Sequence, residues 1–258
     1  MTPSGNPPPA AHRPRRQHQG QGETRRSLPP ASAAIIVFAK APVAGQVKTR
    51  LCPPLTPDEA ASLHGSLVLD ILERCQSLKG YDRILAGTPS PHHPFFRAME
   101  ARFKIPVWDQ QGEDLGARMA GVFKQALDVP YRSVVVTGTD IPGINGPLLT
   151  TALKSLQDHD VVLGPTVDGG YYLIGLRSYV PDLFKNIPWS TDQVYALTEQ
   201  KVKMLGLSLK ILPTLRDLDT VEDLHMCIRD SKDRQNQMFS SRTKNVLQEL
   251  AIRLTNRD

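Results

Sequence analysis

The stretch S-V-V-V-T-G-T-D-I-P, residues 133–142, decides the fold. Its first five residues form a short apolar run rich in valine, which is typical of a strand buried on both faces of a parallel sheet. The next residues break the run and place a carboxylate, Asp140, just after the strand. The sequence therefore predicts a central strand whose loop brings an acidic group to the sheet edge where ligands bind in such folds.

Further apolar runs and helical patterns alternate on both sides of this strand. A helix is expected from Thr56, because Pro57 suits the first helical position and Glu59 completes a capping box. The other strands are expected at residues 34–39, 83–86, 105–108, 161–163, 171–176 and 208–212. Further helices are expected near 95–102, from about 113, and at 147–156, 221–227 and 245–254. This alternation predicts a three-layer α/β fold, with a mostly parallel twisted sheet and helices on both faces.

The composition separates a tail from the body of the chain. The net charge is +5 over 258 residues, but five arginines against one glutamate put most of it into residues 1–30. We expect residues 1–32, rich in proline and arginine, to be disordered and residues 33–258 to form a single domain. The nearly neutral body gives no reason to expect nucleic-acid binding. The chain holds no apolar run long enough for a membrane helix and only three dispersed cysteines, so a cytoplasmic location is expected.

The loop after the first strand, residues 40–50, is rich in cations. It reads K-A-P-V-A-G-Q-V-K-T-R and holds Lys40, Lys48 and Arg50 around the flexible Gly45. Backbone N–H groups together with lysine or arginine are what a phosphate needs. The loop is neither a Walker A motif nor G-x-G-x-x-G. Two interpretations remain open at this point, a phosphate-binding loop and a solvated basic connection.

Acidic residues mark two further loops. Asp140 could hold a divalent cation or be a turn residue. Asp219 could cap the helix that follows it, with Glu222 completing a capping box, and Asp217 shares its side of the chain.

A fourth loop, residues 164–172, combines glycines with polar and aromatic residues. Its segment Asp168-Gly169-Gly170-Tyr171 allows a backbone to approach a ligand closely, although a plain turn would also explain the glycines. The histidines lack ligand spacing, so no metal or general-base role is assigned to them.

Six motifs, taken together, resemble a known family. They are F-A-K-A-P-V-A-G-Q-V-K-T-R-L (38–51), G-E-D-L-G-A-R-M (112–119), G-T-D-I-P (138–142), G-P-T-V-D-G-G-Y-Y-L-I-G-L (164–176), P-W-S-T (188–191) and D-L-D-T-V-E-D-L (217–224). The chain resembles the CofC-like, radical-SAM/selenodomain-associated transferases, which are glycosyltransferase-like members of the GT-A nucleotide-diphospho-sugar transferase superfamily. The similarity covers about residues 33–225.

This resemblance implies the roles of individual residues. It implies a GT-A sheet that binds a nucleotide, with phosphates held by Lys40, Gly45, Lys48, Thr49, Arg50 and Thr139. It implies Mg²⁺ or Mn²⁺ on Asp140 and Asp219, and an acceptor side formed by Asp168, Gly169, Gly170 and Tyr171. Lys48, Arg50 and Asp168 would be the catalytic residues. Superfamily members that transfer sugars usually carry D-x-D at the strand end, and here the first aspartate of that pair is absent, since the stretch reads T-G-T-D-I.

The function expected from these residues is metal-dependent nucleotidyl transfer. A phosphorylated small molecule would attack a nucleoside triphosphate and release pyrophosphate, and positioning with charge neutralisation would supply most of the catalysis. Two alternatives stay open. One is glycosyl transfer from a nucleotide sugar, and the other is a nucleotide-binding module without turnover.

Overall fold

The computed structural model describes Met1 and residues 33–128, 131–233 and 237–255. The predicted disordered tail therefore lies, apart from Met1, outside the described residues. Within the described residues one seven-stranded sheet is formed, in the order β3-β2-β1-β4-β6-β5-β7. The strands are β1 (Ala33–Lys40), β2 (Tyr81–Thr88), β3 (Val107–Asp109), β4 (Ser133–Thr137), β5 (Val161–Pro165), β6 (Tyr171–Leu176) and β7 (Leu209–Ile211).

The strand directions define two opposite edges of the sheet, one where the parallel strands end and one where they begin. β1 runs parallel to β2 and β4, and β5 runs parallel to β7. β6 runs antiparallel to both of its neighbours, β4 and β5. The last residues of β1, β4 and β5 therefore meet the first residues of β6 at one edge, which we call the carboxyl edge. The opposite edge is the amino edge. The predicted, mostly parallel α/β sheet is confirmed.

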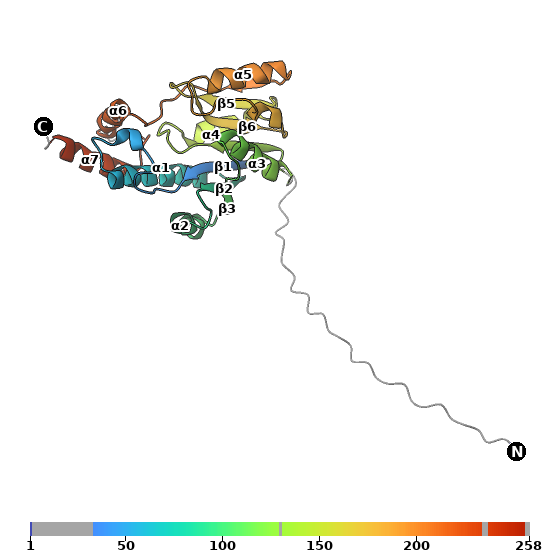
Figure 1. Ribbon diagram of the computed structural model, residues 1–258, viewed down its shortest axis with the longest axis horizontal. Helices are drawn as coiled ribbons and strands as arrows, with labels where there is room; N and C mark the ends of the chain where they lie inside the picture. The colour runs from blue at the N-terminus through green and yellow to red at the C-terminus, as the bar shows by residue number, and fades with distance from the viewer. Residues whose placement is uncertain (2–32, 129–130, 234–236, 256–258) are drawn as a thin grey trace.

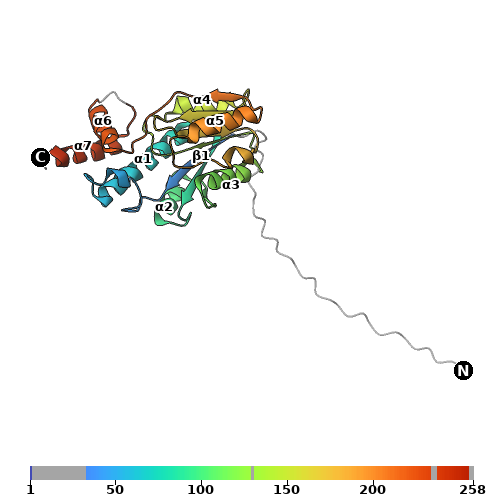
Figure 2. The same cartoon turned by 45° about the horizontal axis from the view of Figure 1, so that its top comes forward.

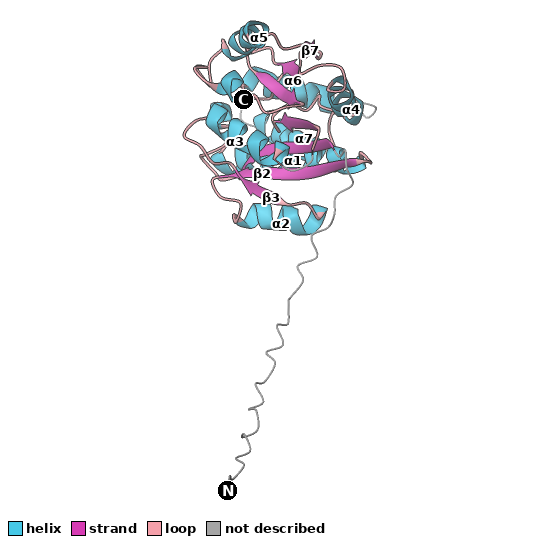
Figure 3. Ribbon diagram, turned by 90° about the vertical axis from the view of Figure 1, so that its right-hand side faces the viewer, coloured by secondary structure: helices cyan, strands magenta, loops and turns pink. Residues whose placement is uncertain are grey.

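Helices cover both faces of the sheet (Figures 1 and 3). One face packs against α1 (Pro57–Ser77), α2 (Pro94–Phe103) and α4 (Gly146–Ser155). The other packs against α3 (Leu115–Leu127), the short helix η2 (Pro181–Phe184) and α5 (Val194–Met204). Alternate residues of β1 serve the two layers: Ile35 and Val37 face the first, and Ala34 and Ile36 the second. Because both faces are covered, the strands are apolar throughout.

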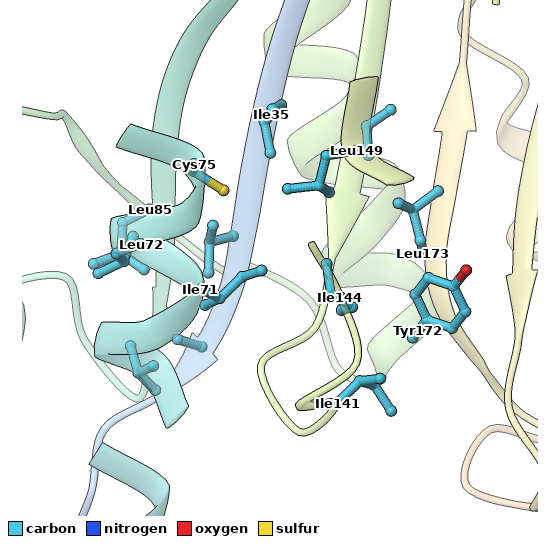
Figure 4. Close-up of a cluster of buried hydrophobic side chains, with 14 of the residues drawn as sticks. Ile35, Ile71, Leu72, Cys75, Leu85, Ile141, Ile144, Leu149, Tyr172 and Leu173 are labelled. Carbon is cyan, nitrogen blue, oxygen red and sulfur yellow. The ribbon is translucent and has the colours of Figure 1, made fainter. Parts of the chain in front are cut away.

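The first of these layers is a continuous apolar core (Figure 4). Ile35 of β1 and Leu173 of β6 lie across the sheet surface from Ile71 of α1 and Leu149 of α4. These side chains are 0–2 % exposed, and burying each one removes its apolar surface from water. The same packing holds β4 in the middle of the sheet, next to the loop that carries Asp140.

A third apolar cluster involves the two C-terminal helices. The short helix η1 (Thr49–Leu51) and the first half of α1 pack against α6 (Val221–Ser231) and α7 (Ser241–Thr255). The two terminal helices lie side by side beyond the sheet (Figures 1 and 2). The last third of the chain therefore contacts the loop that follows the first strand.

Most elements predicted from the sequence are confirmed, with ends that move by a few residues. The helix α5 was not predicted. Its buried positions Val194, Thr198 and Val202 give a single narrow stripe that includes a polar residue, and Gln193 at its start makes no side-chain cap. In the described parts of the chain, no helix is both long and apolar enough to cross a membrane.

Candidate active site

Lys48 is the centre of the candidate site. The Lys48 side chain is only 2 % exposed, so the interpretation of the loop as a solvated basic connection is wrong for this residue. Its Nζ lies 2.5 Å from Oδ1 of Asp140 and 3.4 Å from Oδ1 of Asp219, and it donates a hydrogen bond of 2.6 Å to the carbonyl oxygen of Leu218. The burial comes from a segment 170 residues further along the chain, which closes over the β1 loop. One ammonium group thus joins the two carboxylates predicted to bind metal.

Asp140 is held on one side and open on the other. Its carboxyl oxygen Oδ1 is buried against Lys48, while the side chain as a whole remains 47 % exposed. Burial acts to raise the pKa of Asp140, but the Lys48 ammonium and the neighbouring His64 ring outweigh it and hold this pKa well below its usual value. The interpretation of Asp140 as a turn residue receives no support, because its carboxylate contacts the side chains of Lys48 and His64.

His64 is a neighbour of the site that sequence reasoning missed. It lies on α1 and is 5 % exposed. Its Nε2 lies 2.9 Å from the carbonyl oxygen of Lys40, and its Nδ1 lies 3.5 Å from Oδ1 of Asp140. The available signal was a polar residue within the apolar stripe of a helix, between Ala60 and Leu67. Such a residue needs a polar partner inside the fold.

Asp219 is free of the capping role that the sequence also allowed. The capping box at the start of α6 is formed by Thr220 and Asp223, one residue later than predicted with Asp219 and Glu222. The Asp219 carboxylate instead contacts Lys48 and accepts a hydrogen bond of 3.1 Å from Arg50. Arg50 is 65 % exposed, so its guanidinium faces solvent as well as the carboxylate.

The remaining residues predicted to bind phosphate surround this centre. Lys40 ends β1, is exposed, and donates 2.7 Å to the carbonyl oxygen of Gln46. Gly45 has a φ of +74°, a left-handed conformation that suits glycine. Thr49 begins η1, and Thr139 is buried beside Asp140. All four lie on the two loops that leave the carboxyl ends of β1 and β4.

A cavity of about 580 Å³ adjoins these loops at the carboxyl edge. We call it the carboxyl-edge cavity. Its lining brings together five of the predicted site residues with six others, from η1, α3, the β5–β6 turn, the loop before α5 and the loop before α6. The lining residues are Arg50, Leu115, Asp168, Gly170, Tyr171, Trp189, Ser190, Thr191, Asp192, Val194 and Asp219.

The β5–β6 turn is fixed by its own hydrogen bonds. Asp168 Oδ1 accepts from the Thr166 hydroxyl at 2.5 Å and from the Gly170 N–H at 3.1 Å. Gly169 has a φ of +88°, and a Cβ at this position would lie 2.0 Å from the carbonyl oxygen of Asp192. The glycine is therefore required both by the turn and by the close approach of the loop before α5. Asp168 is presented to the cavity from a rigid turn.

Arg74 of α1 holds the loop that carries Asp140 by hydrogen bonds to the backbone just after it. Its guanidinium, on α1, donates to the carbonyl oxygens of Pro142 at 3.0 Å and Ile144 at 2.8 Å. It also donates to the carbonyl oxygen of Met238, just before α7. The backbone of Asp140 is held in turn, because its carbonyl oxygen accepts 2.9 Å from the N–H of Leu218.

The residues at this centre fit one divalent cation. Two carboxylates come to one ammonium group, and one of them, Asp140, remains 47 % exposed although its Oδ1 is buried against Lys48. Mg²⁺ takes one or two carboxylates and completes its shell with water and phosphate. Within the described ranges, no group of three or more His, Cys, Asp or Glu side chains gathers around one point. A cation here would therefore depend on phosphate oxygens for part of its shell.

A second cavity, of about 680 Å³, lies at the amino edge. It is lined by the first residues of three strands, Ala33, Tyr81 and Ser133, together with side chains such as Lys154 and Arg177. None of the residues predicted to act in catalysis or binding lies there. We call it the amino-edge cavity.

Solved structures of other proteins share the fold of this chain. The chain is similar over 88 % of its length to a proposed nucleotide-diphospho-sugar transferase from Desulfovibrio desulfuricans G20, with 35 % identity, a TM-score of 0.79 and 98 % of that chain covered. A cytidylyltransferase from Leptospira borgpetersenii has the same fold at a TM-score of 0.52, with 14 % identity over 88 % of this chain and 96 % of that one. The fold is therefore that of the nucleotide-diphospho-sugar transferases, and the protein is a transferase.

The family follows from the same findings. Residues 71–191 match the family described as "Uncharacterized protein conserved in bacteria (DUF2064)". The chain belongs to the same family as the Desulfovibrio protein, which it matches at 35 % identity over 98 % of that protein's length. It is also 25 % identical to 2-phospho-L-lactate guanylyltransferase of Methanothermobacter thermautotrophicus over 186 residues, which are 69 % of this chain and 76 % of the relative.

Proposed function

We propose that the protein is a metal-dependent nucleotidyltransferase, which transfers a nucleotidyl group from a nucleoside triphosphate to a small molecule and releases pyrophosphate. The observation that carries this proposal is the contact of Lys48 with both Asp140 and Asp219 beneath a cationic loop. Similarity to a guanylyltransferase and to the fold of a cytidylyltransferase supports the same reaction class. The finer assignment to the CofC-like, selenodomain-associated transferases is part of this proposal.

The cations of the site divide into two kinds. Lys48 is buried and already neutralised by carboxylates, so its role is to bring Asp140 and Asp219 together and fix their orientation. Arg50 and Lys40 are exposed and are the cations free to contact the β- and γ-phosphates. The Thr49 hydroxyl and the backbone around Gly45 would complete the phosphate site.

Asp140 and Asp219 would hold Mg²⁺ or Mn²⁺. When bound, the cation neutralises charge on the reacting phosphates and orients them for in-line attack. The second carboxylate oxygen of Asp140 would be available to the cation, because Lys48 and His64 contact only Oδ1. The acceptor would enter through the carboxyl-edge cavity, next to Asp168, Gly170 and Tyr171. The motif resemblance favours a phosphorylated acceptor.

The test is product analysis. The purified protein is incubated with each nucleoside triphosphate, Mg²⁺ or Mn²⁺ and a panel of small acceptors, and pyrophosphate is measured. Pyrophosphate released in step with a nucleotidylated acceptor supports the proposal. Release of a nucleoside diphosphate from nucleotide sugars would instead support glycosyl transfer. Nucleotide binding without turnover in either assay would identify a binding module.

A further inference from the structure

The carboxyl-edge cavity differs in charge from the phosphate side of the same site. Arg50 supplies positive charge to its lining, and that guanidinium already faces Asp219 at 3.1 Å. Asp168 and Asp192 also line the cavity. Among the described residues, no lysine, arginine or histidine forms an ion pair with either of them. The acceptor side of the cavity thus carries unpaired negative charge.

A dianionic phosphate placed beside Asp168 and Asp192 would meet repulsion from both, since unit charges about 4 Å apart interact measurably even in water. A neutral hydroxyl meets the opposite situation, because a carboxylate accepts a hydrogen bond from it.

Part of the cavity wall is aromatic. Tyr171 and Trp189 meet edge to face with ring centroids 6.4 Å apart. The Trp189 indole lies directly against Gly116, where a Cβ would be 2.3 Å from its Nε1. The wall is therefore held in place by the first turn of α3. Aromatic rings in one lining with carboxylates and with the hydroxyls of Ser190 and Thr191 suit a ligand that has both C–H faces and hydroxyl groups.

We propose that the acceptor is an uncharged, polyhydroxylated molecule and that Asp168 accepts the proton of its attacking hydroxyl. This inference rests on the proposed nucleotidyl transfer, and it departs from the phosphorylated acceptor expected from the motifs. Asp168 suits the role because the β5–β6 turn holds its Oδ1 through Thr166 and Gly170. Its Oδ2 makes no hydrogen bond within the described residues and is left to receive a proton.

The bond changes are as follows. The acceptor oxygen attacks the α-phosphorus as its O–H proton passes to Asp168, and a new P–O bond forms. The bond from the α-phosphorus to the bridging oxygen breaks, and its electron pair leaves with pyrophosphate. Asp168 then returns the proton to water. A phosphate ester, which attacks through an oxygen that is already anionic, would need no such base.

Binding can be tested without turnover, because Trp189 lines the cavity. The sequence holds two tryptophans, so Trp108→Phe leaves Trp189 as the sole indole reporter. This variant is loaded with Mg²⁺ and a non-hydrolysable triphosphate, then titrated with matched pairs: glycerol and glycerol phosphate, hexoses and hexose phosphates, pentitols and their phosphates. We expect fluorescence changes with neutral members and at least about tenfold weaker responses with their phosphates. A preference for phosphates, or no response to any neutral member, would overturn the proposal.

Turnover then tests the base. With the neutral acceptor found by titration, Asp168→Asn should lower kcat by about 100-fold or more, while the fluorescence titration stays within a few fold of the parent. Asp158→Asn, an exposed residue of the loop before β5, is the charge-matched control and should leave kcat for the neutral acceptor unchanged. Asp192→Asn removes a charge from the cavity lining itself and should improve phosphate binding about fivefold. Equal loss of kcat in Asp168→Asn and Asp158→Asn would contradict the assignment of Asp168. If pyrophosphate never appears but neutral compounds still bind, the nucleotidyl reaction fails while the acceptor class stands.

Discussion

The sheet has a cavity at each of its two edges, and the two differ in what surrounds them. The amino-edge cavity is the larger, about 680 Å³ against about 580 Å³, and it is lined by the starts of three strands. The carboxyl-edge cavity is smaller but adjoins the ends of β1 and β4, where Lys48 joins two carboxylates. Cavity volume is therefore a poor guide to the functional site in this protein. The direction of the strands decides which edge gathers chemical groups.

The strongest test of this difference is Asp140→Asn. The amide retains the size of the side chain but loses the charge that a cation needs, so Mg²⁺-dependent turnover should fall by two orders of magnitude or more. Circular dichroism should show a folded protein. Asp158→Asn, at the amino edge, is the charge-matched control and should keep full turnover. Full turnover in Asp140→Asn at ordinary Mg²⁺ concentration would remove the metal assignment.

Lys48→Met should affect binding and stability together. The methionine fills similar space but removes the ammonium group that pairs with the buried Asp140 oxygen, so the free energy of unfolding should fall by about 1–3 kcal/mol. Triphosphate affinity should fall about tenfold. Arg50→Met is the comparison, because Arg50 is 65 % exposed: it should weaken triphosphate binding with little loss of stability. Denaturant titration and nucleotide titration measure the two effects, and unchanged stability in Lys48→Met would contradict the burial argument.

Two glycines with nearly the same φ angle, one at each edge of the sheet, allow the two edges to be compared directly. Gly169 has a φ of +88° and no room for a Cβ, whereas Gly80, which lines the amino-edge cavity, has a φ of +84° and nothing within 4 Å. Gly80→Ala should cost about 1 kcal/mol, the strain of its φ. Gly169→Ala should cost about 1–3 kcal/mol more and raise KM for the acceptor, because the turn must move away from the Asp192 carbonyl. Equal unfolding free energies for the two variants would refute this.

Acid should remove the stabilisation that Asp140 provides. Its lowered pKa means that the ionised carboxylate favours the folded state above about pH 4, the pKa of an unfolded aspartate, and that this contribution is lost as the pH falls below that value. In EDTA, the parent should therefore be more stable than Asp140→Asn near neutral pH. The gap in unfolding free energy should narrow by about pH 3. A gap that stays constant or widens would show that Lys48 does not stabilise the charged form.

The smallest effect is expected at the amino edge. Lys154→Ala should leave turnover unchanged and stability within about 0.5 kcal/mol, as for most surface substitutions. Steady-state kinetics and thermal denaturation are sufficient measurements. A loss of turnover comparable to that of Arg50→Met would break the contrast between the two cavities.

The fold was predictable because its signals are local. The valine-rich run at residues 133–137 identifies a buried strand, and Thr56 with Glu59 identifies the start of a helix. The helix α5 was not predicted because the polar residue Thr198 occupies the middle of its buried stripe. Residue-by-residue patterns give the elements wherever the burial pattern is apolar and regular.

The environment of the site was less predictable, because it depends on contacts between distant segments. The sequence brought forward Asp140 and Asp219, but the burial of Lys48 comes from Leu218, 170 residues away. The partner of His64 is likewise set by packing, since α1 brings it to the loop after β4. The role of Asp219 depends on the residue at which α6 begins. The N-cap is Thr220, one residue later than predicted, so the Asp219 carboxylate does not cap the helix.

Arg74 has a consequence for how the molecule tolerates shortening. Through one guanidinium, the carbonyls of Pro142 and Ile144 share a donor with the carbonyl of Met238. The segment just before α7 therefore helps to orient the side chain that holds the turn beside β4, although nearly a hundred residues separate the two. Trimming the chain before Met238 would remove one of the three carbonyl acceptors of the Arg74 guanidinium, so the position of that turn depends on more than the sheet.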